Sequence, residues 1–316
     1  MFLEAVKTGI LKGLRTALML LRIIIPIFAC VVFLRHTPLF AWLASIVAPA
    51  MRLFGLPGEA VVPIIVGVFS DEYAVAAAMS GIGFDKAQLT IIAMIALCCH
   101  AIPVETVITR AIGMPALKIA LFRIGLAVFT GVICSWLAAA FLNGSIPGSI
   151  SAGAGMPAAA EFAGIVDAAP LVILAEIGWG ALSLVLTILR VIIPLMVGVE
   201  LMLNYKIVDA LAKKLTPFCR LIGIGKDALL PLLIGLLLGV TYGAGALAEL
   251  KRTNPLGKKD MAVLGVFLFS CHGIIETTYL FAISGASGIF TSALRLAIAI
   301  LVTAGFGRIL AKSTKE

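Results

Sequence analysis

The chain of 316 residues is 62% hydrophobic and 13% charged, with 24 Lys and Arg against 16 Asp and Glu. Soluble domains are about 45–50% apolar and about 25% charged, so this composition excludes a soluble globular protein. The length allows roughly six to ten membrane-spanning helices of about 20 residues and no separate soluble domain, and the net charge of +8 is typical of cytoplasmic loops rather than of nucleic-acid binding.

An apolar run near the N-terminus predicts a first membrane helix that is not cleaved. Lys7, Lys12 and Arg15 precede this run, and no small-x-small cleavage site follows it. Because Lys and Arg gather on the cytoplasmic side of membrane helices, we expect a cytoplasmic N-terminus. Lys312 and Lys315 predict the same side for the C-terminus, in the inner membrane of a bacterial-type cell.

The sequence contains an internal repeat. At an offset of 168 residues, Arg22-Ile-Ile-Ile-Pro26 aligns with Arg190-Val-Ile-Ile-Pro194, and identities at Pro, Gly and Arg continue from there. At an offset of 172, Cys99-His100 aligns with Cys271-His272. Pro, Gly and Arg are not the common residues of membrane helices, so this similarity indicates a duplication rather than shared composition.

The basic residues predict that the two repeats are inverted in the membrane. Residues 36–58 carry a single arginine, whereas their counterpart at 204–227 carries five Lys and Arg. The first segment is therefore expected outside and the second in the cytoplasm. The predicted domains are repeat 1 at residues 1–142, an extracytoplasmic linker without Lys or Arg at 143–168, and repeat 2 at 169–316.

Each repeat is predicted to contain a re-entrant helical hairpin. If residues 228–250 crossed the membrane, the basic residues after them would lie on the wrong side, so we expect a hairpin that turns at 239–245. Residues 60–80 form the matching hairpin, broken at 70–73. The predicted fold is all-α, and each repeat has a spanning helix, an amphipathic interfacial helix, the hairpin, a broken spanning helix and a last spanning helix. The chain then crosses the membrane six times.

The broken helices carry a motif that resembles a known family. Cys271-His-Gly-Ile-Ile-Glu-Thr-Thr-Tyr-Leu-Phe281 resembles the His-x-x-x-Glu-(Glu)-Thr stretch of the nucleoside-recognition, or Gate, domain, and Cys99-His-Ala-Ile-Pro-Val-Glu-Thr106 is a copy with one extra residue. Pairs of such domains occur in spore maturation membrane proteins, in ferrous iron permeases and, more distantly, in concentrative nucleoside transporters. The resemblance implies two hairpins and two unwound helices around a site at the membrane midplane.

Two histidines and two glutamates are candidate site residues in the broken helices. His100 and His272 lie inside apolar runs, and Glu105 and Glu276 follow them, each with a threonine behind it. Ionisable groups at membrane depth are costly, which favours a role in a solute pathway. The alternative is that these side chains only satisfy backbone groups freed by the break. The predicted binding residues here are His100, Glu105, Thr106, His272, Glu276 and Thr277.

The hairpin turns supply further candidates. Asp71, Glu72 and Tyr73 lie at the predicted tip of the first hairpin, and Thr241 and Tyr242 lie at the neutral, glycine-rich tip of the second. One tip then offers charge for a coupling ion or solute, and the other offers close backbone approach. Solvated residues at a hairpin tip are the alternative.

A metal site is a separate hypothesis. Cys99 and His100 with Cys271 and His272 could converge and bind Zn²⁺ or Fe²⁺. The alternative is that each cysteine packs as a small apolar residue, because neighbours in sequence point about 100° apart on a helix.

The predicted function is a secondary transporter or permease that moves a small polar or ionic solute by alternating access. The alternatives are a divalent-metal permease, or a membrane partner protein that transports nothing and resembles spore maturation proteins. No phosphate loop, Ser-His-Asp order or zinc-hydrolase motif is visible, so we expect neither an enzyme nor a bound cofactor. The expected partners are the solute or ion, the lipid bilayer, and a second copy or another membrane protein.

Overall fold

The computed structural model describes residues 2–142 and 170–313, apart from 81, 112–113, 240–256 and scattered positions within 36–48 and 208–227. In these residues every regular element is a helix, which confirms the predicted all-α class. The helices of the first half are α1 (Phe2–Arg35), η1 (Arg52–Phe54), η2 (Gly58–Ala60), α3 (Val61–Phe69), α4 (Glu72–Ser80), α5 (Lys86–Cys99), α6 (Ile102–Ala111) and α7 (Ala116–Phe141). Those of the second half are α9 (Pro170–Asn204), α11 (Leu229–Leu238), α13 (Lys258–Ser270), α14 (Ile274–Ile283) and α15 (Gly288–Ser313).

The helix bounds reproduce the duplication. A shift of 168 residues carries the start of α1 onto the start of α9, and that of α3 onto α11. A shift of 172 residues carries both ends of α6 onto those of α14, and both ends of α7 onto those of α15. The predicted interfacial helices and most of the second hairpin fall largely outside the described residues, and the domain boundaries at 142 and 169 stay predictions.

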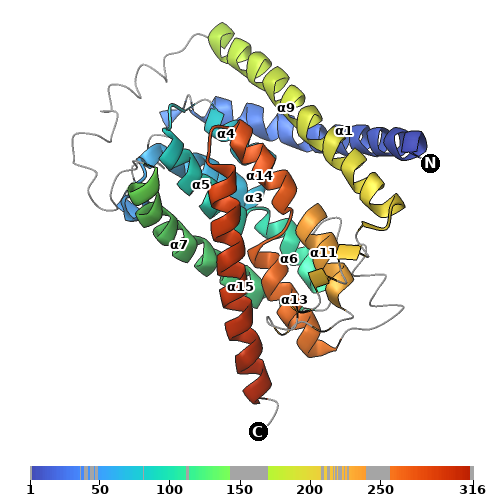
Figure 1. Cartoon of the computed structure of the whole chain (residues 1–316). Coiled ribbons are helices and arrows are strands. Elements are labelled where there is room, and N and C mark those ends of the chain that lie inside the picture. The colour runs from blue at the N-terminus through green and yellow to red at the C-terminus, as the bar shows by residue number, and fades with distance from the viewer. Residues whose placement is uncertain are drawn as a thin grey trace.

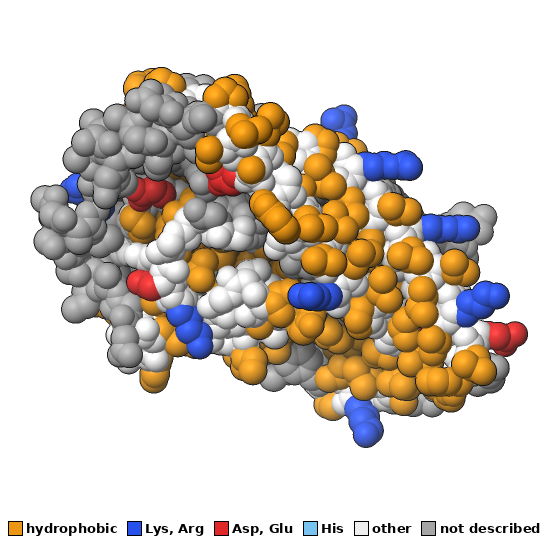
Figure 2. Space-filling view, turned by 90° about the horizontal axis from the view of Figure 1, so that it is seen from above, with side chains coloured by type: hydrophobic (Ala, Val, Ile, Leu, Met, Phe, Trp, Pro, Cys, Tyr) orange, Lys and Arg blue, Asp and Glu red, His pale blue; other side chains and the backbone are white. Residues whose placement is uncertain are grey.

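Five described helices are long and apolar enough to cross a membrane. They are Lys86–Val107, Ala116–Phe141, Pro170–Met202, Lys259–Ile283 and Gly288–Leu310. The predicted sixth crossing corresponds to α1, which is not among these five. Hydrophobic side chains predominate on the face shown in Figure 2, as expected of a surface in contact with lipid.

Helices α1 and α9 cross one another beside the bundle formed by the other helices (Figure 1). Glycines on α1 allow the close approach: a Cβ atom at Gly9 would lie 2.6 Å from the Cα of Val197, and one at Gly13 would lie 3.1 Å from the Cα of Ile193. Small residues play this role at membrane helix interfaces, where van der Waals packing is the main attraction. Lys12 of α1 also forms an ion pair with Glu200 of α9.

Helices α3 and α4 form a hairpin around the predicted break. A Cβ atom at Gly67 would lie 2.7 Å from a methyl carbon of Val75, although a continuous helix would separate these residues by about 12 Å. The carboxylate of Asp71 accepts a hydrogen bond of 2.9 Å from the backbone N–H of Ala74 and so caps the start of α4. Residues 73–79 of α4 are buried, which places this short helix in the interior of the fold.

The contact between α1 and α9 generates a first prediction. Gly9→Ala should lower the melting temperature of the detergent-purified protein, because the added methyl group collides with the backbone of α9. Gly178→Ala on α9 is the matched control, since nothing lies within 4 Å of a Cβ atom there. Ala is favoured over Gly in a helix by about 1 kcal/mol, so the control should melt no lower than the parent. Equal melting of both variants would contradict the close approach.

Candidate functional site

Two helices are interrupted in the middle of the apolar bundle. Helix α5 ends at Cys99, His100 is extended, and Ala101 has a φ of 49° before α6 begins. In the second half, Cys271 is extended and Gly273 has a φ of 58° before α14 begins. Both predicted helix breaks are therefore present. Ala101 and Gly273 occupy equivalent positions, and both have the left-handed conformation that favours glycine.

Helices α3 and α11 pair backbone groups that the breaks set free. The N–H of Ala101 donates to the carbonyl oxygen of Gly67 at 2.8 Å, and the N–H of Gly273 donates to that of Gly235 at 3.2 Å. Gly67 on α3 and Gly235 on α11 are equivalent in the two repeats, so the same hydrogen bond joins the broken helix to an equivalent helix in each half. In a membrane interior without water, leaving one N–H without a hydrogen bond would cost roughly several kcal/mol.

The two histidine side chains meet at this level. The Nδ1 atom of His100 lies 3.2 Å from the carbonyl oxygen of Ala96, and that of His272 lies 2.8 Å from that of Leu268. A carbonyl oxygen only accepts, so each Nδ1 is the donor in this contact, and the Nε2 atoms of the two rings face each other. The two Nε2 atoms are 3.3 Å apart. Both side chains are buried.

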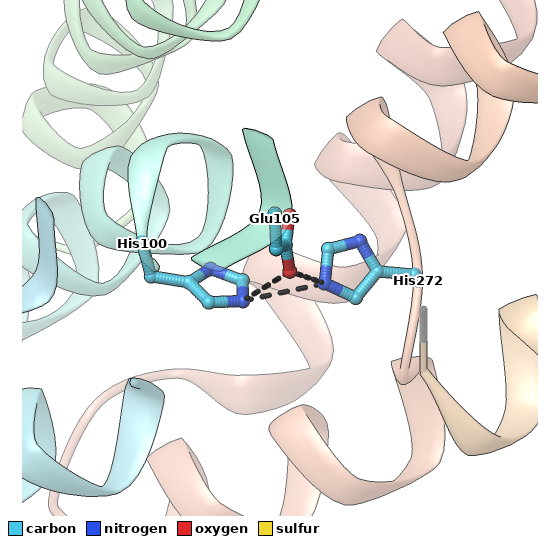
Figure 3. Close-up of side chains that lie close together, drawn as sticks. All are labelled: His100, Glu105 and His272. Atoms are coloured by element: carbon cyan, nitrogen blue, oxygen red, sulfur yellow. Dashed lines mark hydrogen bonds and ion pairs between the residues drawn. The ribbon is translucent and has the colours of Figure 1, made fainter. Parts of the chain in front are cut away.

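Carboxylates complete the cluster. Oε1 of Glu105 lies 3.4 Å from Nε2 of His272 and 3.6 Å from Nε2 of His100 (Figure 3). Oε2 of Glu72, at the start of α4, lies 3.4 Å from Nε2 of His100. The hairpin thus contributes Glu72 to the cluster, the first broken helix contributes His100 and Glu105, and the second contributes His272.

Arg123 of α7 holds the first broken helix together. Its guanidinium pairs with Oε2 of Glu105 at 2.5 Å and donates to the carbonyl oxygens of Cys98 at 3.0 Å and His100 at 2.8 Å. Its side chain is 2% exposed. The repeat alignment indicates this residue through its equivalence with Arg295, but sequence reasoning assigned it no role.

Glu276 accepts a hydrogen bond from the hydroxyl of Tyr73 on the hairpin. Because α6 and α14 both begin two residues after their histidine, the helices superpose without a gap. Glu105 is then equivalent to Thr277 rather than to Glu276. One residue is about 100° of helix rotation, so the two motif glutamates project from different helix faces.

Arg295 of α15 is equivalent to Arg123 but has no carboxylate partner within the described part of the chain. Its Nε donates to the carbonyl oxygen of Ser270 at 3.0 Å. Both Nη atoms are buried without a hydrogen bond, and the residue is 1% exposed. The shift of the acidic position to Glu276 explains this asymmetry, because the position that would face Arg295 is Thr277.

The other predicted site residues have local roles or lie elsewhere. The hydroxyls of Thr106 and Thr277 donate to carbonyl oxygens four residues earlier on their own helices. The thiol of Cys99 donates to the carbonyl oxygen of Ile95 at 3.2 Å. The described residues that come together as metal ligands are His100, Glu105 and His272, and neither Cys99 nor Cys271 is in this group. Thr241 and Tyr242 lie outside the described residues.

Comparison with known proteins agrees with this architecture. The Gate family model, described as nucleoside recognition, matches residues 17–115 and again residues 185–287. The chain belongs to the Gate family. The two Gate matches are two copies of one unit, each of which contains a first hairpin arm and a broken helix with its histidine. The resemblance stated from the sequence is therefore confirmed.

The chain is also similar to a protein of similar length from Bacillus subtilis (strain 168). It is named "Uncharacterized membrane protein YvoD" and is 28% identical over 295 residues, which cover 93% of this chain and 91% of the relative. No solved structure matches the chain.

The left-handed residue at each break generates a second prediction. Ala101→Gly should raise the free energy of unfolding by about 1 kcal/mol, because glycine removes the cost of a left-handed alanine. Gly273→Ala should lower it by a similar amount, and nothing closer than 3.7 Å crowds its added methyl group. Denaturant-induced unfolding in detergent measures both. Shifts of the same sign in both variants would contradict the shared backbone conformation.

The two buried arginines generate a third prediction. Arg123→Met should destabilise the protein by roughly 3–5 kcal/mol, because it leaves the buried Glu105 carboxylate without its ion pair. Arg295→Met should cost much less, since it separates no ion pair between described residues. Melting temperatures of the two variants in one detergent test this difference. A loss at Arg295 as large as that at Arg123 would show that its guanidinium has a partner of equal strength.

Proposed function

We propose that the protein is a secondary transporter or permease that moves a small polar or ionic solute across the bacterial inner membrane. One observation carries this proposal. Two helices of a membrane protein are broken at equivalent points, and ionisable side chains from both halves are buried between them and a helical hairpin. Such groups are expensive at membrane depth and mark solute or ion pathways. Broken helices in paired repeats are the usual frame of such a site.

The contacts across the site connect the two repeats. His100 meets His272, Glu105 meets His272, and Tyr73 of the first hairpin bonds to Glu276 of the second broken helix. A movement of one repeat against the other would separate these pairs and open the site. Alternating access in repeat-based transporters is largely a rocking of this kind.

The inverted topology belongs to the same proposal. It places both termini in the cytoplasm and the linker at 143–168 outside, as the distribution of Lys and Arg favours. The first hairpin is then re-entrant. The family model is described as nucleoside recognition, so nucleosides are one class of solute to test, together with small organic anions and metal cations.

Uptake into proteoliposomes tests the proposal. Glu276→Gln should reduce uptake at least 10-fold while the melting temperature stays close to that of the parent, because the amide oxygen still accepts the Tyr73 hydroxyl. Asp85→Asn is the matched control: Asp85 is an exposed helix cap, and asparagine caps equally well, so uptake should not change.

Two outcomes would contradict the proposal. One is full uptake by the Glu276→Gln variant, which would show that Glu276 is not part of the solute pathway. The other is the absence of uptake for every solute class, combined with purification of the protein at a fixed ratio with a second membrane protein. That result would favour the alternative of a membrane partner.

A further inference from the structure

We propose that His100, His272 and Glu105 bind a divalent first-row transition-metal ion, with Glu72 beside the site. This inference rests on the proposed function and narrows its solute class to such cations. His100 and Glu105 come from the first repeat and His272 from the second, so the ion would sit where the two halves of the molecule meet (Figure 3).

The spacing of the donor atoms fits one ion. Nε2 of His100, Nε2 of His272 and Oε1 of Glu105 form a triangle with sides of 3.3, 3.4 and 3.6 Å. Nitrogen and oxygen ligands at about 2.0–2.1 Å around a tetrahedral ion are separated by roughly 3.3–3.4 Å from one another. Oε2 of Glu72 lies 3.4 Å from Nε2 of His100, beside the group that the other three residues form.

The orientation of the histidines turns both Nε2 atoms towards the carboxylate. Each Nδ1 donates to a backbone carbonyl oxygen, that of Ala96 or that of Leu268. The two Nε2 atoms and Oε1 of Glu105 then face one another in a buried space. A cation held between these three atoms would contact all of them, so the geometry is that of a ligand set.

The surroundings orient these groups as metal ligands are commonly oriented. Each imidazole donates its other ring proton to a backbone carbonyl, and Arg123 binds the second oxygen of Glu105. Such partners fix the ring orientation and the carboxylate plane. Glu105 is already balanced by Arg123, and Glu72 is a second carboxylate beside the site.

The donor types select the class of ion. Two imidazoles with carboxylates suit Zn²⁺, Co²⁺ and Fe²⁺, whereas Mg²⁺ and Ca²⁺ prefer oxygen ligands alone. The described cysteines lie outside this ligand group, which disfavours soft ions such as Cu(I).

Titration of the chelator-stripped, detergent-purified protein with Co²⁺ tests the inference, with its visible absorption as the readout. We expect one equivalent of Co²⁺ to bind with the intense absorption of tetrahedral coordination and to be displaced by Zn²⁺ but not by Mg²⁺. In His100→Gln/His272→Gln the affinity should fall more than about 100-fold, because loss of an outer partner alone costs roughly 10–100-fold. His36→Gln, which removes the third histidine of the chain, should bind as the parent does.

The alternative occupant of the site is a proton shared between the two Nε2 atoms. No absorption change with Co²⁺, or an unchanged affinity in the double variant, would overturn the inference in favour of that proton. The titration requires no transport, so it separates this inference from the proposed function. Co²⁺ binding without Co²⁺ uptake into proteoliposomes would support the site and contradict transport of the ion. Uptake of an organic solute without Co²⁺ binding would support the proposed transporter and overturn the metal site.

Discussion

Broken helices inside a membrane are stable only if something pairs the backbone groups that each break sets free. Here one hydrogen bond does so in each half, from the N–H of Ala101 to Gly67 and from that of Gly273 to Gly235. The hairpin arm is thus tied to the break. The same break turns each histidine out of its helix and into the space between the repeats, so the site depends on this backbone contact.

The two halves are equivalent in backbone but not in charge. Arg123 neutralises Glu105 in the first half, whereas Arg295 has only a carbonyl oxygen in the described structure of the second. A shift of the acidic residue by one position turns Glu276 towards Tyr73 on the hairpin. A duplicated frame therefore carries two different sets of side chains.

Much of this architecture could be predicted from local patterns. The repeat, the breaks after Cys99 and Cys271 and the first hairpin tip follow from Pro and Gly positions, apolar runs and basic residues. The shared motif matches Glu105 with Glu276 in the sequence, but the superposed helices place Glu105 at the position of Thr277. A motif match does not take the rotation of the helix into account. The repeat alignment identifies Arg123 as an arginine present in both halves. Its partner Glu105 could not be predicted, because that ion pair depends on how α7 packs against α5 and α6.

The sequence by itself determined that the chain is a duplicated helical membrane protein with ionisable groups beside two helix breaks, because hydropathy, charge bias and helix breakers are local properties. Only the tertiary structure decided that His100 and His272, which lie 172 residues apart in the chain, present their Nε2 atoms to each other and to Glu105. It also left the cysteines out of this cluster. The physical reason is that convergence of side chains depends on helix rotation and packing between distant segments, which no local pattern records.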